Sequence, residues 1–205
     1  MIRLAAIVVL AFALAGCGSG SNDNGAASPA TTSTSPTTTS TSPPSMQTIP
    51  ACMPSPSAST SPKKSSANEN REMMYLTDVS LDREECSAKV TFAFEQQAPG
   101  PGYDVSYQPA DTAKIEDASG NPIEIAGDAF LVVKLSPAMT AKIDGDQVVP
   151  TYTGPRRIPG TDPITEVVKT GDFEAVVTWV IGLDSKRSFM THTSDSQLIV
   201  EIDRS

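Results

Sequence analysis

The sequence predicts an all-β fold, a two-layer β-sandwich of roughly eight to ten mostly antiparallel strands preceded by a disordered stalk. Three observations support this prediction. Apolar residues after residue 71 alternate with a period of two, which is typical of strands with one buried face. Short clusters of Gly, Asn and Asp separate these runs. The segment before them consists mainly of Ser, Thr and Pro.

The first element along the chain is an export signal. One positive charge, Arg3, precedes an uninterrupted apolar run from Leu4 to Ala15. A short charged lead, an apolar run of this length and small residues at its end are the parts of a secretory signal. The run is too short for a membrane-spanning helix, which needs about 20 residues. Residues 1–16 are therefore predicted to be a signal peptide that is removed.

The end of this signal resembles the lipobox of bacterial lipoproteins. In Leu14-Ala15-Gly16-Cys17 the small residues suit cleavage just before Cys17, whose thiol would then carry a diacylglycerol. Acyl chains such as palmitate contribute about 0.8 kcal/mol per buried methylene, so several chains anchor a protein stably. We expect Cys17 to hold the mature protein on the extracytoplasmic face of the cell membrane, with its domain exposed toward the cell wall. The alternative is an ordinary cleaved signal followed by a chance cysteine.

Residues 17–70 form the predicted linker. Between residues 28 and 66, 29 of 39 residues are Ser, Thr or Pro, and none is aromatic. Such a segment buries too little apolar surface to offset its ordering entropy, so we expect a disordered stalk, which its hydroxyl density marks as a candidate for O-glycosylation. The alternating glycines of GCGSGS at 16–21 favour a flexible tether over a phosphate loop, because no strand precedes them and no helix follows.

The charge of the chain excludes some partners. The formal net charge is −9, whereas nucleic-acid binding needs clustered Lys and Arg. An acidic protein is also repelled by an anionic lipid surface, apart from its own anchor. We therefore expect no nucleic-acid partner.

Residues 71–205 have the length of one domain. The runs with strand alternation are KVTFAFE at 89–95, YDVSYQ at 103–108 and LIVEID at 198–203. Two further runs, AFLVVKL at 129–135 and FEAVVTWVIGL at 173–183, are apolar on both faces, as expected of central strands covered on both sides. In the last run, one face carries no charge and is the best candidate for the middle of the core: Phe173, Ala175, Val177, Trp179 and Ile181.

Turn signals connect these runs. DASGNP at 117–122, DGD at 144–146 and TGD at 170–172 supply the left-handed backbone angles that tight hairpins require. The domain also contains nine prolines, which argue against long helices.

Two cysteines remain once Cys17 is lipidated. Cys52 and Cys86 would be exported, and the cell exterior permits disulfides. Pairing them would tie the end of the stalk to the domain and stabilise it by roughly 3–4 kcal/mol at most. The alternatives are two free thiols or a catalytic cysteine.

Catalytic and metal chemistry has little support in the sequence. The single histidine, His192, could act as a base oriented by Asp195, but no nucleophile motif accompanies it. Zinc requires a cluster of Cys and His, and the acidic loops at 117–121 and 144–146 lack the calcium pattern of an EF-hand. We therefore expect no enzyme, no catalytic or metal-binding residues and no cofactor.

The candidate ligand-binding residues are Tyr152, Arg156 and Arg157. They lie in YTGPRRIPG at 152–160, where two arginines concentrate positive charge in an otherwise acidic domain, next to an aromatic ring. The alternative is a solvated loop rich in Pro and Gly. We expect Trp179 to belong to the core rather than to a sugar-binding platform.

The domain as a whole resembles a known family. The order of YDVSY, DASGNPIEIAGDAFLVVKL, GDFEAVVTWVIGLDSKRSF and LIVEI is similar to the AMIN-like domain of actinobacterial lipoproteins, which combine a lipobox and a Ser/Thr-rich stalk with one such domain. Members carry an Asp-Arg pair and a further Arg where this chain has Ala88-Lys89 and Gln197. An ion pair or ligand contact made by those charges would be lost or replaced here.

The resemblance implies a function in the cell envelope. Related AMIN domains of cell-wall amidases and secretins are β-sandwiches that help to place their proteins in the envelope, with peptidoglycan as the suggested ligand. This chain would then be a non-enzymatic, lipid-anchored module that binds a cell-wall polymer, either peptidoglycan or an associated glycan, on a sandwich face or the 152–160 loop. The alternative is an accessory or regulatory subunit of a cell-wall enzyme or transporter.

Overall fold

The structure is a computed structural model that describes residues 52–53, 55–65, 72–95, 102–194 and 196–205. The predicted signal peptide, Cys17 and residues 18–51 of the predicted stalk lie outside this part of the chain.

The described residues form thirteen strands and one short helix. In chain order they are β1 (Lys63–Lys64), β2 (Met74–Arg83), β3 (Ser87–Phe94), β4 (Gly102–Gln108), α1 (Ala110–Ala113), β5 (Ala129–Ser136), β6 (Ala138–Met139), β7 (Ala141–Asp144), β8 (Gln147–Pro150), β9 (Arg157–Pro159), β10 (Ile164–Phe173), β11 (Val176–Leu183), β12 (Phe189–Ser194) and β13 (Gln197–Asp203).

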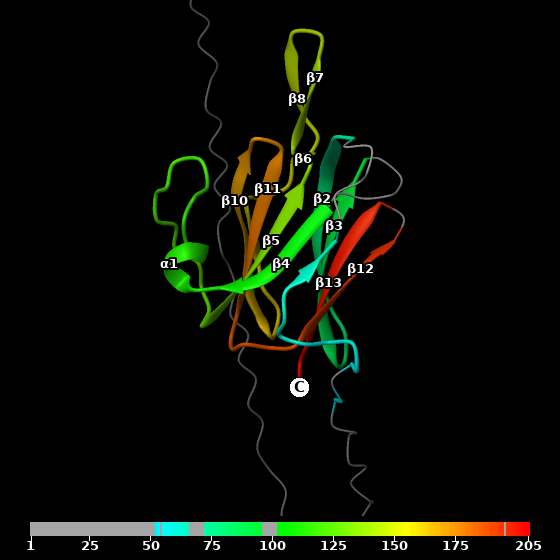
Figure 1. Cartoon of the computed structure of the whole chain (residues 1–205), viewed down its shortest axis with the longest axis vertical. Helices are drawn as coiled ribbons and strands as arrows, with labels where there is room; N and C mark the ends of the chain where they lie inside the picture. The colour runs from blue at the N-terminus through cyan, green and yellow to red at the C-terminus, as the bar shows by residue number, and fades with distance from the viewer. Residues whose placement is uncertain (1–51, 54, 66–71, 96–101, 195) are drawn as a thin grey trace, which may run out of the picture. The chain divides into compact units, whose positions relative to one another are not determined.

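Two sheets pack face to face, as Figure 1 shows. One has six strands in the order β1-β4-β5-β11-β10-β9, and the other has five in the order β12-β13-β3-β2-β6. All neighbours are antiparallel except β2 and β6. The predicted all-β sandwich is confirmed. The strands outnumber the eight to ten expected because short edge strands such as β1, β6 and β9 are too brief to alternate.

The main core lies between the two sheets. Strand alternation decides which side chains enter it: Val90 and Phe92 of β3 are fully buried, whereas Lys89 between such positions is only partly so. Trp179 of β11 occupies the middle of the core with an edge-on contact to Phe92 at 6.1 Å between ring centroids. The predicted core face of this strand is confirmed for its part within β11.

A second, smaller apolar cluster covers the outer face of the six-stranded sheet. Ala113 of α1 and Ile125 of the following loop pack on outward-facing side chains of the sheet: Phe130, Val132, Val168 and Val180. Figure 1 shows α1 and this loop beside the six-stranded sheet, on the side away from the other sheet. This cover explains why β5 and β11 are apolar on both faces, as predicted.

One of the three predicted hairpin turns differs in the structure. The turn between β10 and β11 falls at Glu174 and Ala175, which have positive φ of 51° and 61°, so TGD lies inside β10 at a register shift. Phe173 therefore ends a strand and is 55% exposed instead of entering the core. The 117–122 segment makes the predicted turn, with positive φ of 68° at Gly120 and an antiparallel bridge between Ile115 and Pro122. The predicted turn at 144–146 does close the β7–β8 hairpin.

The folded unit begins before residue 71, the boundary that composition indicates. Cys52 and Cys86 form a disulfide, which confirms the predicted pairing. Ser59 then bridges to Phe189 of β12, and β1 adds to the free edge of β4. These contacts attach residues 52–65 to both sheets although their composition is that of a stalk.

Candidate functional site

Tyr152 of the predicted ligand loop is a core residue. Its ring is 7% exposed and packs edge-on against Trp179 at 5.6 Å between centroids. Its hydroxyl donates to the carbonyl of Pro155 at 2.8 Å. The ring of this candidate ligand-binding residue therefore offers no face for a sugar to stack on. The local sequence is rich in Pro and Gly, which indicates a solvated loop, but the Tyr152 ring is buried because it packs against Trp179.

Arg156 and Arg157 have structural partners instead of a free, ligand-facing charge. Arg156 pairs with Glu116 through one guanidinium nitrogen, and its Nε donates to the carbonyl of Lys169 at 2.9 Å. Arg157 pairs with Glu166 and donates to the carbonyl of Glu124 at 2.7 Å. The two arginines thus fasten the loop that follows α1 to strand β10, and we define residues 114–127 as the roof loop.

The roof loop and α1 enclose a cavity of about 360 Å³ on the outer face of the six-stranded sheet. This volume lies in the range of small-ligand sites. Its floor comes from the strands β4, β5, β11 and β10, and its wall from α1 and the roof loop. The lining residues that carry the argument below are Asp104, Asp117, Lys134, Thr170, Thr178 and Val132.

Strand register builds the floor of this outer-face cavity. Lys134 of β5 is paired with Asp104 of β4 on one side and with Thr178 of β11 on the other. Gly171 of β10 is the next residue in this row. Since paired residues point to the same face of a sheet, one polar row crosses four strands. The adjacent row places Val132 between Val180 of β11 and the polar Ser106 of β4.

Polar atoms without partners concentrate in this cavity. Among the described residues, five buried side-chain oxygen or nitrogen atoms have no hydrogen-bond partner. Three of them line the cavity, namely Oδ1 of Asp104 and the hydroxyls of Thr170 and Thr178. Both threonines are only 2% exposed. Burying an unpaired polar group is costly, so these three atoms mark the floor of the cavity as an unusual part of the sheet.

Charged groups of both signs face the cavity. Lys134 and Asp117 are exposed, and neither side chain makes a hydrogen bond or ion pair with the described residues. Oδ2 of Asp104 pairs with Lys64 of β1 at 2.7 Å, which leaves Oδ1 as the unpartnered atom. The site therefore combines one free cation, one free anion and two free hydroxyls.

The position of Asp117 depends on a glycine below it. A Cβ built on Gly171 would lie 2.0 Å from Oδ2 of Asp117 and 2.8 Å from its Cβ. Only a residue without a side chain leaves room for this carboxylate. The amide of Asp117 also donates to the carbonyl of Thr170 at 3.1 Å, which holds the roof loop against β10.

A neighbouring cavity of about 350 Å³ continues the site toward the edge of the sheet. It shares Asp104 and Lys134 with the first cavity and also includes Lys64 and Ser65. The two cavities therefore adjoin across one pair of residues. An extended ligand can occupy both.

Glu116 of the roof loop carries a carboxylate that is held by hydrogen bonds. Hydrogen bonds from Ser119 and then from Arg156 lower the pKa of its carboxyl below the ordinary value. The carboxylate is thus held ionised, and it keeps Arg156 on the roof loop. Lys89, where the sequence departs from the pattern that the resemblance implies, pairs with Glu84 at 2.6 Å.

Among the described residues, the structure shows no catalytic partner for His192. His192 is exposed on the edge strand β12, opposite Ile199, and Asp195 lies outside the described residues. No group of three or more Cys, His, Asp or Glu suited to a metal ion occurs in the described part of the chain. Among its helices, none has the length and apolarity to cross a membrane.

Sequence reasoning missed the residues of the outer-face cavity. One signal was present: Lys134 is the only charge in the apolar run 129–135, and a charge in a doubly covered strand needs a reason. Asp117 was assigned to a hairpin turn, and Thr170 to another. Lys134, Asp117 and Thr170 line one cavity because of the order of the strands in the sheet, which the sequence does not show.

Comparison with known proteins gives one match. The family model described as AMIN-like domain matches residues 74–204. No curated protein and no solved structure matches the chain.

Proposed function

The chain belongs to the AMIN-like domain family, and from this premise we propose that it is a non-enzymatic lipoprotein of the actinobacterial type, which binds a cell-wall polymer. The polymer is peptidoglycan or an associated glycan. In this proposal Cys17 carries the lipid, and the domain faces the wall from the outer side of the membrane.

The observation that carries the binding role is the outer-face cavity. It gathers three of the five unpartnered buried polar atoms of the described residues and adjoins a second cavity. Wall polymers are rich in hydroxyl and amide groups, which would satisfy such atoms. The proposal thus places the ligand on a sandwich face and assigns Arg156 and Arg157 to holding the roof loop.

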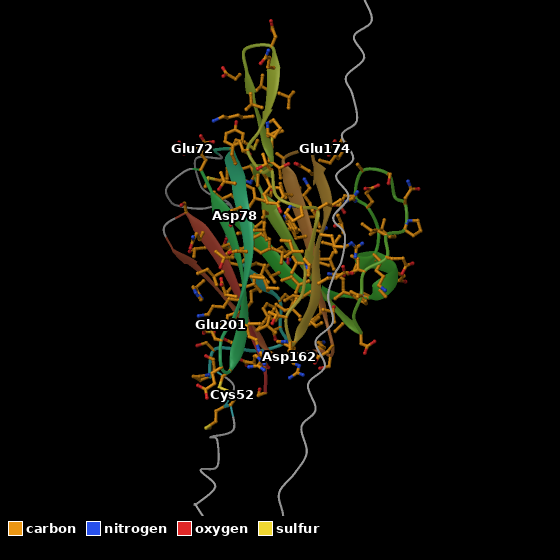
Figure 2. All side chains as sticks on the ribbon, turned by 180° about the vertical axis from the view of Figure 1, so that it is seen from behind. Cys52, Glu72, Asp78, Asp162, Glu174 and Glu201 are labelled. Carbon is orange, nitrogen blue, oxygen red and sulfur yellow. A yellow bond between two sulfur atoms is a disulfide. The ribbon has the colours of Figure 1, made fainter. Side chains whose placement is uncertain are left out.

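The disulfide lies at one end of the sandwich. Figure 2 shows Cys52 at one end of the sandwich and Glu174 at the other. Residues 18–51 then separate the proposed lipid from the folded unit. In a polyproline II conformation these residues would reach roughly 100 Å.

Two experiments test the proposal. The purified chain from residue 17 onward, made without lipid, should sediment with purified peptidoglycan, and Lys134→Met should reduce the bound fraction. Lys142→Met, which removes a lysine outside both cavities, is the matched control. Independently, Cys17→Ser should shift the full-length protein from the membrane fraction to the medium. A full-length variant that stays membrane-bound contradicts the anchor, and absence of sedimentation contradicts the wall ligand.

A second candidate function is based on the β7–β8 hairpin. The β7–β8 hairpin extends beyond the sandwich in Figure 1, and its paired Ile143 and Val148 are 75% and 72% exposed. Exposed apolar side chains of this kind are typical of protein contacts. The chain would then be an accessory or regulatory subunit of a cell-wall enzyme or transporter. Co-purification of one membrane protein, lost in Ile143→Ser/Val148→Ser, would support this function, whereas sedimentation with peptidoglycan supports the first.

A further inference from the structure

The β7–β8 hairpin is amphipathic, and its apolar face is exposed. Paired residues of two antiparallel strands point to the same face, and so do residues two apart along one strand. The pair Ile143–Val148 therefore shares a face with the pair Ala141–Pro150, and no side chain of this face has a charge or a hydrogen-bonding group. Ile143 and Val148 are 75% and 72% exposed. We define these four residues as the apolar hairpin face.

The opposite face of the hairpin is turned toward the domain. Lys142 and Val149 are paired on this face, and both are partly buried. Lys142 forms an ion pair at 2.8 Å with Glu95, the residue that follows β3. This contact turns the Lys142 side of the hairpin toward the five-stranded sheet and the apolar hairpin face away from it. A two-stranded hairpin is marginally stable in water when nothing covers its apolar face.

Carboxylates lie beside the apolar hairpin face. Asp144 and Asp146 flank the turn of the hairpin. Glu174 lies at the β10–β11 turn, where the carbonyl of Ala175 accepts a hydrogen bond from the amide of Ala138 in β6, just before the hairpin. All three carboxylates are exposed, and none of them forms an ion pair with the described residues. This end of the sandwich therefore combines exposed apolar side chains with uncompensated negative charge.

These charges select among the surfaces that could cover the apolar hairpin face. An anionic lipid surface would be repelled by the carboxylates. A second copy of the chain would bring identical acidic patches together, because a symmetric dimer uses the same patch on both subunits, and each chain has a formal net charge of −9. A protein surface with apolar side chains and neighbouring Lys or Arg would bury Ile143 and Val148 and also pair with the carboxylates.

We propose that the apolar hairpin face docks on a partner protein whose contact surface is apolar and bordered by Lys or Arg, with Ile143 and Val148 buried at its centre and the three carboxylates paired at its edge. This inference rests on the accessory-subunit function proposed above, and it names the chemistry of the partner's surface. It does not depend on the outer-face cavity, since none of these residues lines that cavity.

Synthetic peptides with two alternating residues test this chemistry directly. The probes are a Leu-Lys, a Leu-Glu and a Ser-Lys peptide of equal length, each labelled with a fluorophore and titrated into the chain from residue 17 onward while anisotropy is recorded. The Leu-Lys peptide should bind. The other two lack either the cations or the apolar side chains and should bind at least about tenfold more weakly. Equal affinity for the Leu-Lys peptide and either of the others would overturn the inference.

A pair of serine substitutions tests the apolar contribution. Ile143→Ser/Val148→Ser should weaken binding of the Leu-Lys peptide at least about tenfold at every salt concentration, because two apolar side chains no longer leave water. Met53→Ser is the matched control, since Met53 is 87% exposed and lies outside the hairpin. An equal loss of affinity in the control would overturn the assignment to the hairpin.

A pair of amide substitutions tests the charge contribution. Asp144→Asn/Asp146→Asn should weaken binding of the Leu-Lys peptide about three- to tenfold at low salt and have little effect at high salt, because exposed charges are screened. Asp111→Asn/Glu124→Gln removes two exposed carboxylates elsewhere and should leave the affinity unchanged. If both double variants weaken binding equally, the carboxylates of the hairpin have no special role and the inference fails.

Photo-crosslinking in cells identifies what covers the apolar hairpin face. A photoreactive benzoylphenylalanine replaces Val148 in the full-length protein, and the crosslinked peptide is identified by mass spectrometry. It should come from one other protein and lie in an apolar surface bordered by Lys or Arg. A crosslink to a second copy of the chain or to lipid, or a yield no higher than from the same group at position 53, would overturn the inference.

Two outcomes separate this inference from the proposed functions. A crosslink to a partner whose contact surface lacks Lys and Arg overturns the inference and retains the accessory-subunit function. Ile143→Ser/Val148→Ser should leave sedimentation with peptidoglycan unchanged. Loss of sedimentation in this variant would mean that the hairpin contacts the wall polymer, which overturns the partner-protein inference and retains wall binding.

Discussion

Arg157 should stabilise the domain through one carboxylate of the main sheet. Glu166 of β10 is 8% exposed and accepts hydrogen bonds from the amide of Ala126 and from Arg157. Arg157→Ala removes the guanidinium and leaves this carboxylate with one donor. It also removes the bond to the carbonyl of Glu124. The roof loop thereby loses one of its attachments to the sheet, the bond between Arg157 and the Glu124 carbonyl.

The burial of the two partners sets the size of the effect. Breaking a fully buried pair costs about 3–5 kcal/mol, and an exposed pair is worth about 0–1 kcal/mol. The Glu166 side chain is 10% exposed but that of Arg157 is 47% exposed, so the cost lies between these limits. We expect a loss of about 2 kcal/mol in the free energy of unfolding, which corresponds to roughly 4–8 °C in Tm for a domain of this length.

Urea unfolding followed by circular dichroism measures this loss. The matched control is Arg83→Ala, because Arg83 makes an exposed pair with Asp162 at 3.8 Å and should lose less than about 0.5 kcal/mol. Glu166→Gln alone and combined with Arg157→Ala completes a double-mutant cycle, in which we expect a coupling of about 1–2 kcal/mol. Hydrogen exchange should become faster at the Ala126 amide.

The reasoning fails if Arg157→Ala costs no more than Arg83→Ala. It also fails if the Ala126 amide exchanges at the wild-type rate. Either outcome would mean that the roof loop is held by other contacts.

Three further predictions concern the roof loop and the disulfide. Gly171→Val should displace Asp117 and lower the fraction of protein that sediments with peptidoglycan, whereas an unchanged fraction would show that Asp117 does not contact the ligand. Cys52→Ser/Cys86→Ser opens a loop with a sequence separation of 34 and should lower the free energy of unfolding in urea by about 3–4 kcal/mol. A loss below about 1 kcal/mol would contradict the stabilising role of the disulfide. The pKa of Glu116 is lowered in the folded state, so its contribution to stability is present above its unfolded pKa and is lost as pH falls through the folded value. Glu116→Gln should therefore flatten the acid side of the curve of unfolding free energy against pH. An unchanged curve would contradict this prediction.

The sequence predicts the core well because strand alternation is a local property. Val90 and Phe92 are assigned to the core by their spacing alone, and the structure confirms both. Local signals fail where the turn is made by unusual residues. Glu174 and Ala175 adopt positive φ angles, and neither residue type marks a turn in the sequence.

The candidate site depends on strand order, which the sequence does not contain. Asp104, Lys134 and Thr178 become neighbours only because β4, β5 and β11 are adjacent in the sheet. Tyr152 is a residue for which the local sequence predicts the wrong environment. Its Pro- and Gly-rich surroundings predict a solvated loop, and only the contact with Trp179 places it in the core.

The position of the ligand on the domain is the most direct test of the proposed binding role. Soluble peptidoglycan fragments that keep their peptides can be titrated into the isotopically labelled chain from residue 17 onward while backbone amide shifts are recorded by NMR. We predict shifts concentrated at the residues that line the outer-face cavity and its roof, namely Asp104, Ser106, 112–117, Val132, Lys134, Thr170 and Thr178. Shifts confined to the β7–β8 hairpin at 141–150, or no shifts at all, would contradict the account.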